Sequence, residues 1–315
     1  LLVSVLVSVG VWCFDLCAVV TPIQIKSTIK SSAFIFAAAK SRRMMNRVQG
    51  AKPYGEKMEE ILAGLEHLSA SADSPLLEKK DNPQKYLLVV VTANRGLCGG
   101  YNSNVLKLAR FRIAELQQQG KDVEVQVIGK KGASYFKFIK VPVERVYTDI
   151  DDTFTLSRSY ELGRYLMDRF QAKGCDVIEV VSTVYYSSAT QLPEVKQMLP
   201  IGQETTASRS HMRASTGTGS EEQKPEEGYR QNMIFEPDAE TIIEKLLPHL
   251  LQTVLFRSLL EAVTAEQIYR RVAMKAANDA AGDMTKSLTQ LYNRKRQASI
   301  TQELAEIVSG ADAIA

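Results

Sequence analysis

The chain has few of the residues that enzymes most often use to catalyse reactions or to bind metals. In 315 residues it has only three histidines, His67, His211 and His249, and four cysteines. No histidine belongs to an HExxH pattern or stands in an order that suggests a Ser-His-Asp triad. Cys13 and Cys17 are spaced CxxxC, but no second pair or histidine cluster accompanies them to complete a zinc site. Catalytic and metal-binding functions are therefore left without support.

The chain also has no large excess of positive or negative charge. The formal net charge is only +3, which is too small to indicate a nucleic-acid-binding protein. Positive charge gathers in two short runs, at 40–47 and 294–296, and such runs are usually solvated helix faces. The other two cysteines, Cys98 and Cys175, are far apart in the sequence, so a reducing compartment is expected.

No standard phosphate-binding motif is present. The segment 94–100, NRGLCGG, stands between an expected strand and an expected helix, where a phosphate loop would lie. Its spacing fits neither GxGxxG nor GxxxxGK[ST]. We interpret its glycines as a tight turn and expect Cys98 to be a structural thiol, because no histidine stands near it to activate it.

The N-terminal segment 1–20 is apolar but fits neither common class of N-terminal segment. A signal peptide begins with basic residues, and this segment has none. A membrane-spanning helix needs about 20 uninterrupted apolar residues, and Asp15 interrupts this run. Segment 1–20 is therefore set apart from the rest of the chain.

The C-terminal segment 236–315 is expected to be one long helix. It has no proline after Pro248, and Gly282 is its only glycine before Gly310, which is placed as a C-cap. As a single helix, residues 248–309 would extend about 90 Å. Apolar residues recur at spacings of three and four, which is typical of a coiled coil or of a core helix in an ordinary bundle. The length and the polar end between 289 and 303 favour the coiled coil.

The segment 21–75 is expected to contain a second long helix. Ile25, Ile29 and Phe36 have partial helical spacing, and Gly50 and Pro53 are expected to bend or break the helix locally.

Between these two segments, residues 84–200 alternate strand and helix patterns. This alternation predicts a small parallel, doubly wound sheet. Strands are expected at 86–92, 123–128, 141–147 and 176–186, with helices at 102–119, 130–138 and 155–173. The segment 201–235 is rich in Ser, Thr, Gly and Glu and is expected to be a flexible insert and return.

Three segments closely resemble the gamma subunit of F-type ATP synthases. They are VVVTANRGLCGGYN at 89–102, MKAANDAAGDM at 274–284 and YNRKRQASITQELAEIVSGA at 292–311. The resemblance covers about residues 37–315. It implies an α/β fold with a central Rossmann-like doubly wound sheet. It also implies that the N- and C-terminal helices pair as a long antiparallel α-helical coiled coil.

The resemblance further implies which residues contact partners. In the family, an Arg-Gln pair on the long helix contacts a catch loop of a catalytic beta subunit. The matching residues are Arg296 and Gln297, with Thr301 and Glu303 about a turn further on. Met274 and Lys275 match another region of the shaft that faces the catalytic subunits. The family's role would make this chain the central rotor shaft of a proton-driven ATP synthase, without catalytic residues, metal or cofactor of its own.

The implied partners are three alpha and three beta subunits, an epsilon subunit and the membrane c-ring, with no nucleic acid. The absence of a transit peptide, and of the cysteine-bearing insert of chloroplast gamma subunits, favours a peripheral place on the cytoplasmic face of a bacterial inner membrane. Two alternatives remain open. One is an α/β nucleotide-binding enzyme with a coiled-coil dimerisation arm, and the other is a structural coiled-coil scaffold that would tolerate Arg296→Ala and Gln297→Ala.

Overall fold

The computed structural model describes residues 34–55, 57, 76–78, 80, 82–201 and 239–313. The expected apolar segment 1–20, most of the expected helix at 21–75 and the insert from 202 to 235 lie outside these residues. The chain divides into two compact units. One comprises 39–270 and contains the sheet. The other contains, of the described residues, 34–38 and 271–313.

The sheet has five strands in the order β3-β2-β1-β4-β5. The bounds of these strands are β1 Lys85–Val91, β2 Asp122–Ile128, β3 Arg145–Tyr147, β4 Val177–Tyr185 and β5 Gln191–Leu199. Strands β1 to β4 are parallel, as the sequence predicts, whereas β5 pairs antiparallel with β4. The expectation of an all-parallel sheet was therefore wrong at this edge. Strand β5 carries Pro193, Glu194 and Lys196 and is only half-buried over most of its length, so it lacks the apolar run that marks the buried strands.

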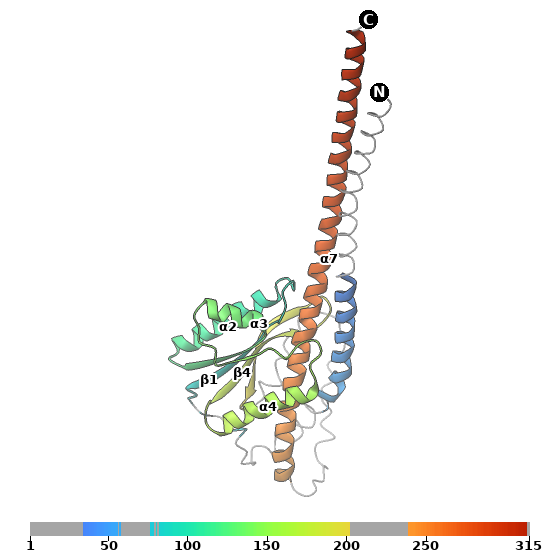
Figure 1. Ribbon diagram of the computed structural model, residues 1–315. Coiled ribbons are helices and arrows are strands. Elements are labelled where there is room, and N and C mark those ends of the chain that lie inside the picture. The colour runs from blue at the N-terminus through green and yellow to red at the C-terminus, as the bar shows by residue number, and fades with distance from the viewer. Residues whose placement is uncertain are drawn as a thin grey trace, which may run out of the picture. The chain divides into compact units, whose positions relative to one another are not determined.

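Helices cover both faces of the sheet (Figure 1). Helices α2 (Tyr101–Gln118) and α3 (Lys130–Phe138) bury their apolar residues against one face. Helix α4 (Leu156–Gln171) packs on the other face with the helix at 34–55 and the first part of α7 (Ala239–Asp312). Helix α7 therefore contributes directly to the core of the α/β domain.

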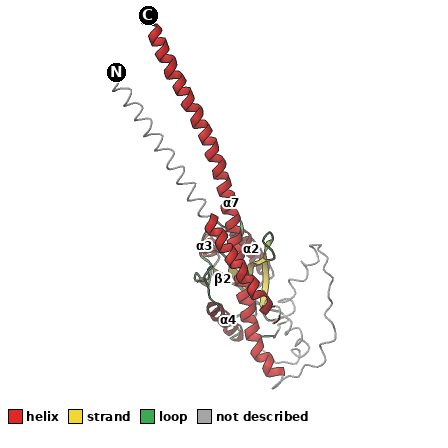
Figure 2. Ribbon diagram, turned by 90° about the vertical axis from the view of Figure 1, so that its right-hand side faces the viewer, coloured by secondary structure: helices red, strands yellow, loops and turns green. Residues whose placement is uncertain are grey.

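Helix α7 is continuous over 74 residues (Figure 2). It passes through Pro248 and Gly282 without ending, and it continues two residues beyond Gly310, where a C-cap was expected. One 18-residue stretch of α7 is apolar enough to cross a membrane, but 67% of that stretch is buried in the protein, as in the core helix of a globular domain. The buried apolar residues of α7 lie in the first part of the helix, between residues 247 and 268. They are Leu247, Leu250, Leu251, Val254, Leu255, Leu259, Leu260, Ala262, Val263, Ala265 and Ile268.

The helix at 34–55 runs antiparallel to α7 within the unit 39–270. The hydroxyl of Thr264 donates to the backbone oxygen of Met44 (3.5 Å), and the hydroxyl of Tyr54 contacts Nε2 of His249 at 2.6 Å. The expected break at Gly50 and Pro53 is absent, because residues 34–55 are all helical. The predicted antiparallel pairing is thus present over the described part of the first helix.

Candidate partner-binding surface and the loops at the sheet edge

The second part of α7 is the most exposed region that the structure describes. Between Arg271 and Ala313, all of them described, no residue is buried. Large apolar side chains remain exposed there: Val272, Met284, Leu288, Leu291, Tyr292, Ile300, Leu304, Ile307 and Val308. A soluble protein rarely leaves so many apolar side chains in water, so this stretch has the character of a surface that partners cover.

The exposed apolar residues form two stripes on α7. Met284, Leu288 and Leu291 follow one another at spacings of four and three, and so do Ile300, Leu304 and Ile307. Leu291 and Ile300 are nine residues apart, which is about two and a half turns of helix. The two stripes therefore face opposite sides of α7.

The polar segment between these stripes contains the residues that match the family's beta-contacting pair. Arg296 and Gln297 are both exposed. No hydrogen bond or ion pair of either side chain occurs within the described part of the chain, whereas the backbone oxygen of Gln297 accepts a bond from the Thr301 hydroxyl at 2.9 Å. Glu303 is exposed and accepts a bond from Ser299 at 3.4 Å. The guanidinium of Arg296 is thus available to an external acceptor.

Helical geometry divides these four residues between two faces. Arg296 and Glu303 are seven residues apart and share one face, while Gln297 and Thr301 are four apart and share the adjacent face. The structure therefore brings all four onto one exposed two-turn segment. Met274 is half-buried and Lys275 is exposed; as consecutive residues they point about 100° apart on the helix.

The loop after β1, at 92–100, is engaged with its own domain. Asn94 donates through Nδ2 to the backbone oxygens of Thr148 (2.9 Å) and Ile150 (3.4 Å), and its Oδ1 accepts from the backbone N–H of Lys130 at 3.1 Å. Gly99 has φ of 53°, as the interpretation of this segment as a tight turn requires. These bonds tie the loop to the chain segments that follow β2 and β3.

Helix α7 fills the crevice in which open α/β sheets usually bind ligands. That crevice lies at the carboxyl ends of the strands, at the point where the strand order reverses, here between β1 and β4. Ala93 and Tyr101, which flank the loop after β1, are buried with Ala265 of α7 and pack against Tyr269. The hydroxyl of Tyr269 donates to the backbone oxygen of Gln191, at the start of β5 (3.3 Å). At this end of the strands, the loop after β1 therefore packs against the protein's own helix.

A buried charge pair lies beside this contact. Arg270 donates through Nη2 to Glu266 (2.6 Å) and to the backbone oxygen of Gly96 (3.5 Å). Burial raises the pKa of Glu266, and the positive charge of Arg270 opposes that shift. Burial also raises the pKa of Cys98, which keeps its thiol protonated and unreactive, as expected for a structural cysteine. Among the described residues, no cluster of His, Cys, Asp or Glu could hold a metal ion.

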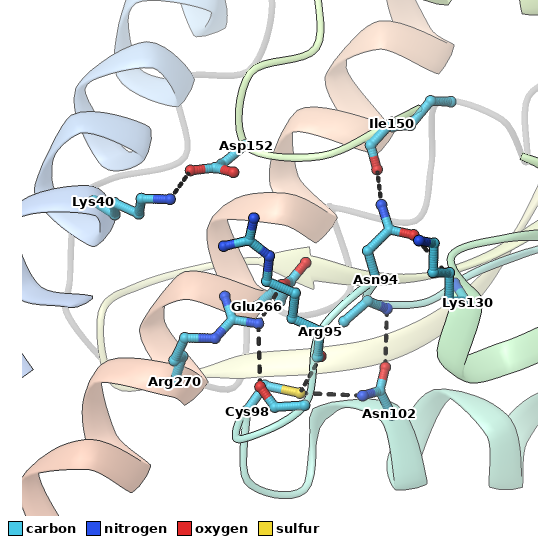
Figure 3. A network of polar contacts seen from close by, with 12 residues as sticks. Lys40, Asn94, Arg95, Cys98, Asn102, Lys130, Ile150, Asp152, Glu266 and Arg270 are labelled. Atoms are coloured by element: carbon cyan, nitrogen blue, oxygen red, sulfur yellow. Dashed lines mark hydrogen bonds and ion pairs between the residues drawn. The ribbon is translucent and has the colours of Figure 1, made fainter. Parts of the chain in front are cut away.

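A second loop, at 148–155, holds the helix at 34–55 (Figure 3). Lys40 forms an ion pair with Asp152 at 2.6 Å. Arg47 donates to the backbone oxygens of Asp152 (3.3 Å) and Phe154 (3.2 Å). Sequence analysis missed the roles of these residues and of Asn94 and Arg270. The polar run DIDDT at 149–153, placed between a strand and a helix, is the local signal that could have drawn attention to this loop.

Comparison with known proteins agrees with this architecture. A family model described as ATP synthase matches residues 23–314. The ATP synthase gamma chain of Leptospira biflexa is 43% identical over 303 residues, covering 93% of this chain and 99% of that protein. The gamma chain of Rhodococcus opacus is 38% identical over 288 residues, covering 85% and 86% of the two chains.

Solved structures show the same fold at lower identity. A chain from the central stalk and c-ring of the Tetrahymena thermophila mitochondrial ATP synthase has a TM-score of 0.54 at 16% identity, covering 79% of this chain and 99% of that one. A chain of the Euglena gracilis mitochondrial ATP synthase has a TM-score of 0.51 at 19% identity, covering 88% and 95%. With a family match over most of its length and relatives well above 30% identity, the chain belongs to the family of ATP synthase gamma chains.

Proposed function

We propose that this gamma chain is the central rotor shaft of a proton-driven ATP synthase. One observation carries the proposal. A single helix is anchored through its first part in the core of the α/β domain, and it then continues for some forty residues in which no described residue is buried. The proposed partners are three alpha and three beta chains around the exposed part, together with an epsilon chain and the membrane ring. The chain itself is a non-catalytic subunit of the complex.

The proposed mechanism is a bias on the conformations of the beta chains. The polar segment around Arg296 presents a charged fork on one side of the exposed helix end. At any shaft angle this side faces one beta chain and not the other two, so the conformer that offers it acceptors is favoured there. Rotation driven by the ring moves this preference from one beta chain to the next. ATP release is thereby coupled to proton flow.

Arg296, Gln297, Thr301 and Glu303 are proposed to contact an acidic loop of the beta chain. Their exposure and the absence of a described partner for the Arg296 guanidinium support this assignment. Met274 and Lys275 are proposed as a further contact of the shaft. The complex is proposed to lie on the cytoplasmic face of a bacterial inner membrane, with this chain attached peripherally through the ring.

Co-assembly tests the proposal. This chain would be expressed with alpha and beta chains of a bacterial relative, and ATP hydrolysis by the purified complex would be measured for the unmodified chain and for Arg296→Ala/Gln297→Ala. Loss of one charge-assisted hydrogen bond removes about 1.5 to 3 kcal/mol, so we expect at least about a tenfold loss in the activity or affinity that depends on it. Lys286→Ala/Gln290→Ala is the matched control, because both residues are exposed on the same helix.

Each outcome separates the candidate functions. An active complex that is weakened by the first pair of substitutions and not by the control supports the rotor assignment and the contact residues together. Equal activity of all three complexes would reject the contact residues and favour a scaffold. A chain that forms no complex and binds a nucleotide alone would reject the rotor assignment in favour of the nucleotide-binding enzyme.

A further inference from the structure

Both helices of the antiparallel pair extend to the boundary of the compact unit that contains the sheet. The unit that contains the sheet begins at Ala39 on the first helix and ends at Arg270 on α7. The large apolar cluster that binds α7 to the sheet ends earlier, at Val263. The last two turns of α7 inside the unit are held by a small apolar cluster, in which Ala265 and Tyr269 pack against Ala93 and Tyr101, and by polar contacts beside it.

On α7, these contacts involve the loop at 92–100. Arg270, the last residue of the unit, reaches the backbone oxygen of Gly96, and its partner Glu266 is buried. On the first helix, the corresponding contacts involve the loop at 148–155, through the ion pair of Lys40 with Asp152 and the bonds of Arg47. Each helix is thus fixed by a different loop of the same α/β domain.

Asn94 joins the two loops to each other. Its amide nitrogen donates to Thr148 and Ile150, and its amide oxygen accepts from Lys130 at the start of α3. Figure 3 shows Lys40 paired with Asp152 and Asn94 bonded to Ile150 of the same loop, and, beside them, the loop at 92–100 that meets Arg270. We use the term exit collar for these two loops together with Lys40, Arg47, Glu266 and Arg270.

We propose that the exit collar fixes both shaft helices to the α/β domain at the point where they leave it, and so sets where the freely twisting length of the shaft begins. This proposal rests on the rotor function proposed above. Apolar packing is non-directional and resists separation of the surfaces, whereas hydrogen bonds and ion pairs of defined geometry also resist a change of angle. For a given torque, a shaft twists in proportion to its free length. Opening the collar removes these directional contacts while the apolar cluster around Ala265 remains, and makes the shaft more compliant.

Single-molecule measurements on the assembled complex test this proposal. A probe particle would be attached to the α/β domain at the exposed position 107, on α2, while a non-hydrolysable ATP analogue holds the other end of the shaft in the alpha and beta chains. The width of the probe's angular distribution reports the torsional stiffness of the shaft between the α/β domain and the end held by the alpha and beta chains. Asn94→Ala, which cuts the link between the loops, and Asp152→Lys, which sets two positive charges opposite each other, are each expected to widen the distribution.

A charge swap and an internal control make the test specific. Lys40→Asp/Asp152→Lys restores the ion pair with reversed signs and is expected to narrow the distribution again. Arg112→Met breaks a charge pair inside the α/β domain, between α2 and β4, that touches neither shaft helix. It is expected to lower the melting temperature without widening the distribution.

The outcomes distinguish the collar from the rotor function. If the unmodified chain assembles and turns but Asn94→Ala and Asp152→Lys both leave the angular width unchanged, the collar is rejected while the rotor function stands. Widening by Arg112→Met as much as by the collar variants would also reject the collar, because general loosening of the domain would then explain the effect. Failure of the unmodified chain to assemble rejects the rotor function itself.

Discussion

Breaking the buried charge pair between Arg112 and Glu179 tests whether the α/β domain depends on this polar contact. Arg112 on α2 donates through Nε and Nη2 to the two carboxylate oxygens of Glu179 on β4, at 2.9 and 2.6 Å. The Glu179 side chain is only 6% exposed, while that of Arg112 is 25% exposed. Arg112→Met keeps most of the side-chain volume but leaves the carboxylate buried and unpaired. Removing one partner of a buried ion pair costs about 3 to 5 kcal/mol.

That cost is large beside the total stability of a folded domain, which is about 5 to 15 kcal/mol. For a unit of this size, each kcal/mol lowers the melting temperature by about 2 to 4 °C, so Arg112→Met should lower it by about 10 °C. Thermal unfolding of the purified chain, followed by circular dichroism, would measure this shift. The double variant Arg112→Leu/Glu179→Leu should recover most of the loss, because it removes both charges together. A loss below about 1 kcal/mol, or a double variant as unstable as the sum of the single ones, would refute the reasoning.

Four further substitutions have expected effects that unfolding experiments can check. Gly129→Ala should prevent stable folding, because φ at this glycine is 102° and a Cβ would lie 2.2 Å from a backbone oxygen; wild-type stability would contradict this. Gly282→Ala should stabilise α7 by about 1 kcal/mol, because no atom of the described residues lies within 4 Å of the added Cβ; no increase in helix melting temperature would count against it. Phe136→Ala should cost about 3 to 5 kcal/mol, since Phe136 is fully buried; a loss below 1 kcal/mol would refute the packing argument. Burial opposes ionisation of Asp176, but bonds from Lys80 and two backbone N–H groups outweigh it and lower its pKa to about 2. That lowered pKa contributes about 2 kcal/mol at neutral pH, which is lost as pH falls from about 4 to about 2. Asp176→Asn should remove this part of the acid dependence of stability, and an unchanged acid profile would rule the contribution out.

The repeating parts of the fold could be predicted from the sequence because local patterns determine them. The apolar run predicts β1 within one residue of its observed bounds, and the helical spacing predicts α7 within three residues at each end. Strand β5 could not be predicted in this way, because it is a half-buried edge strand with Pro193 and charged residues. Its place depends on pairing with β4, which local sequence does not encode.

The contacts that fix α7 and the helix at 34–55 to the two loops were also beyond local patterns. Arg270 and Gly96 are 174 positions apart, and Arg47 and Asp152 are 105 apart. Nothing in the neighbourhood of either member indicates the other, so only the folded chain shows the pairing. For Arg296 and Gln297, by contrast, the local sequence predicts the exposure of the side chains. Their exposure follows from the polar stretch around them, but their proposed role depends on a partner chain and on the family resemblance.

The position of α7 in the chain has a consequence for biosynthesis. The face of the sheet that α7 covers consists of strands that leave the ribosome long before it, since β4 ends at Tyr185 and the apolar residues of α7 extend from Leu247 to Ile268. Until that stretch emerges, the growing chain exposes the apolar side of β1 and β4 and cannot complete its core. A nascent chain halted before Ile268 is thus a substrate for chaperones or proteases. Once residues up to Arg270 have emerged, the domain can close, and the chain then lacks only the part of the helix proposed to meet other subunits.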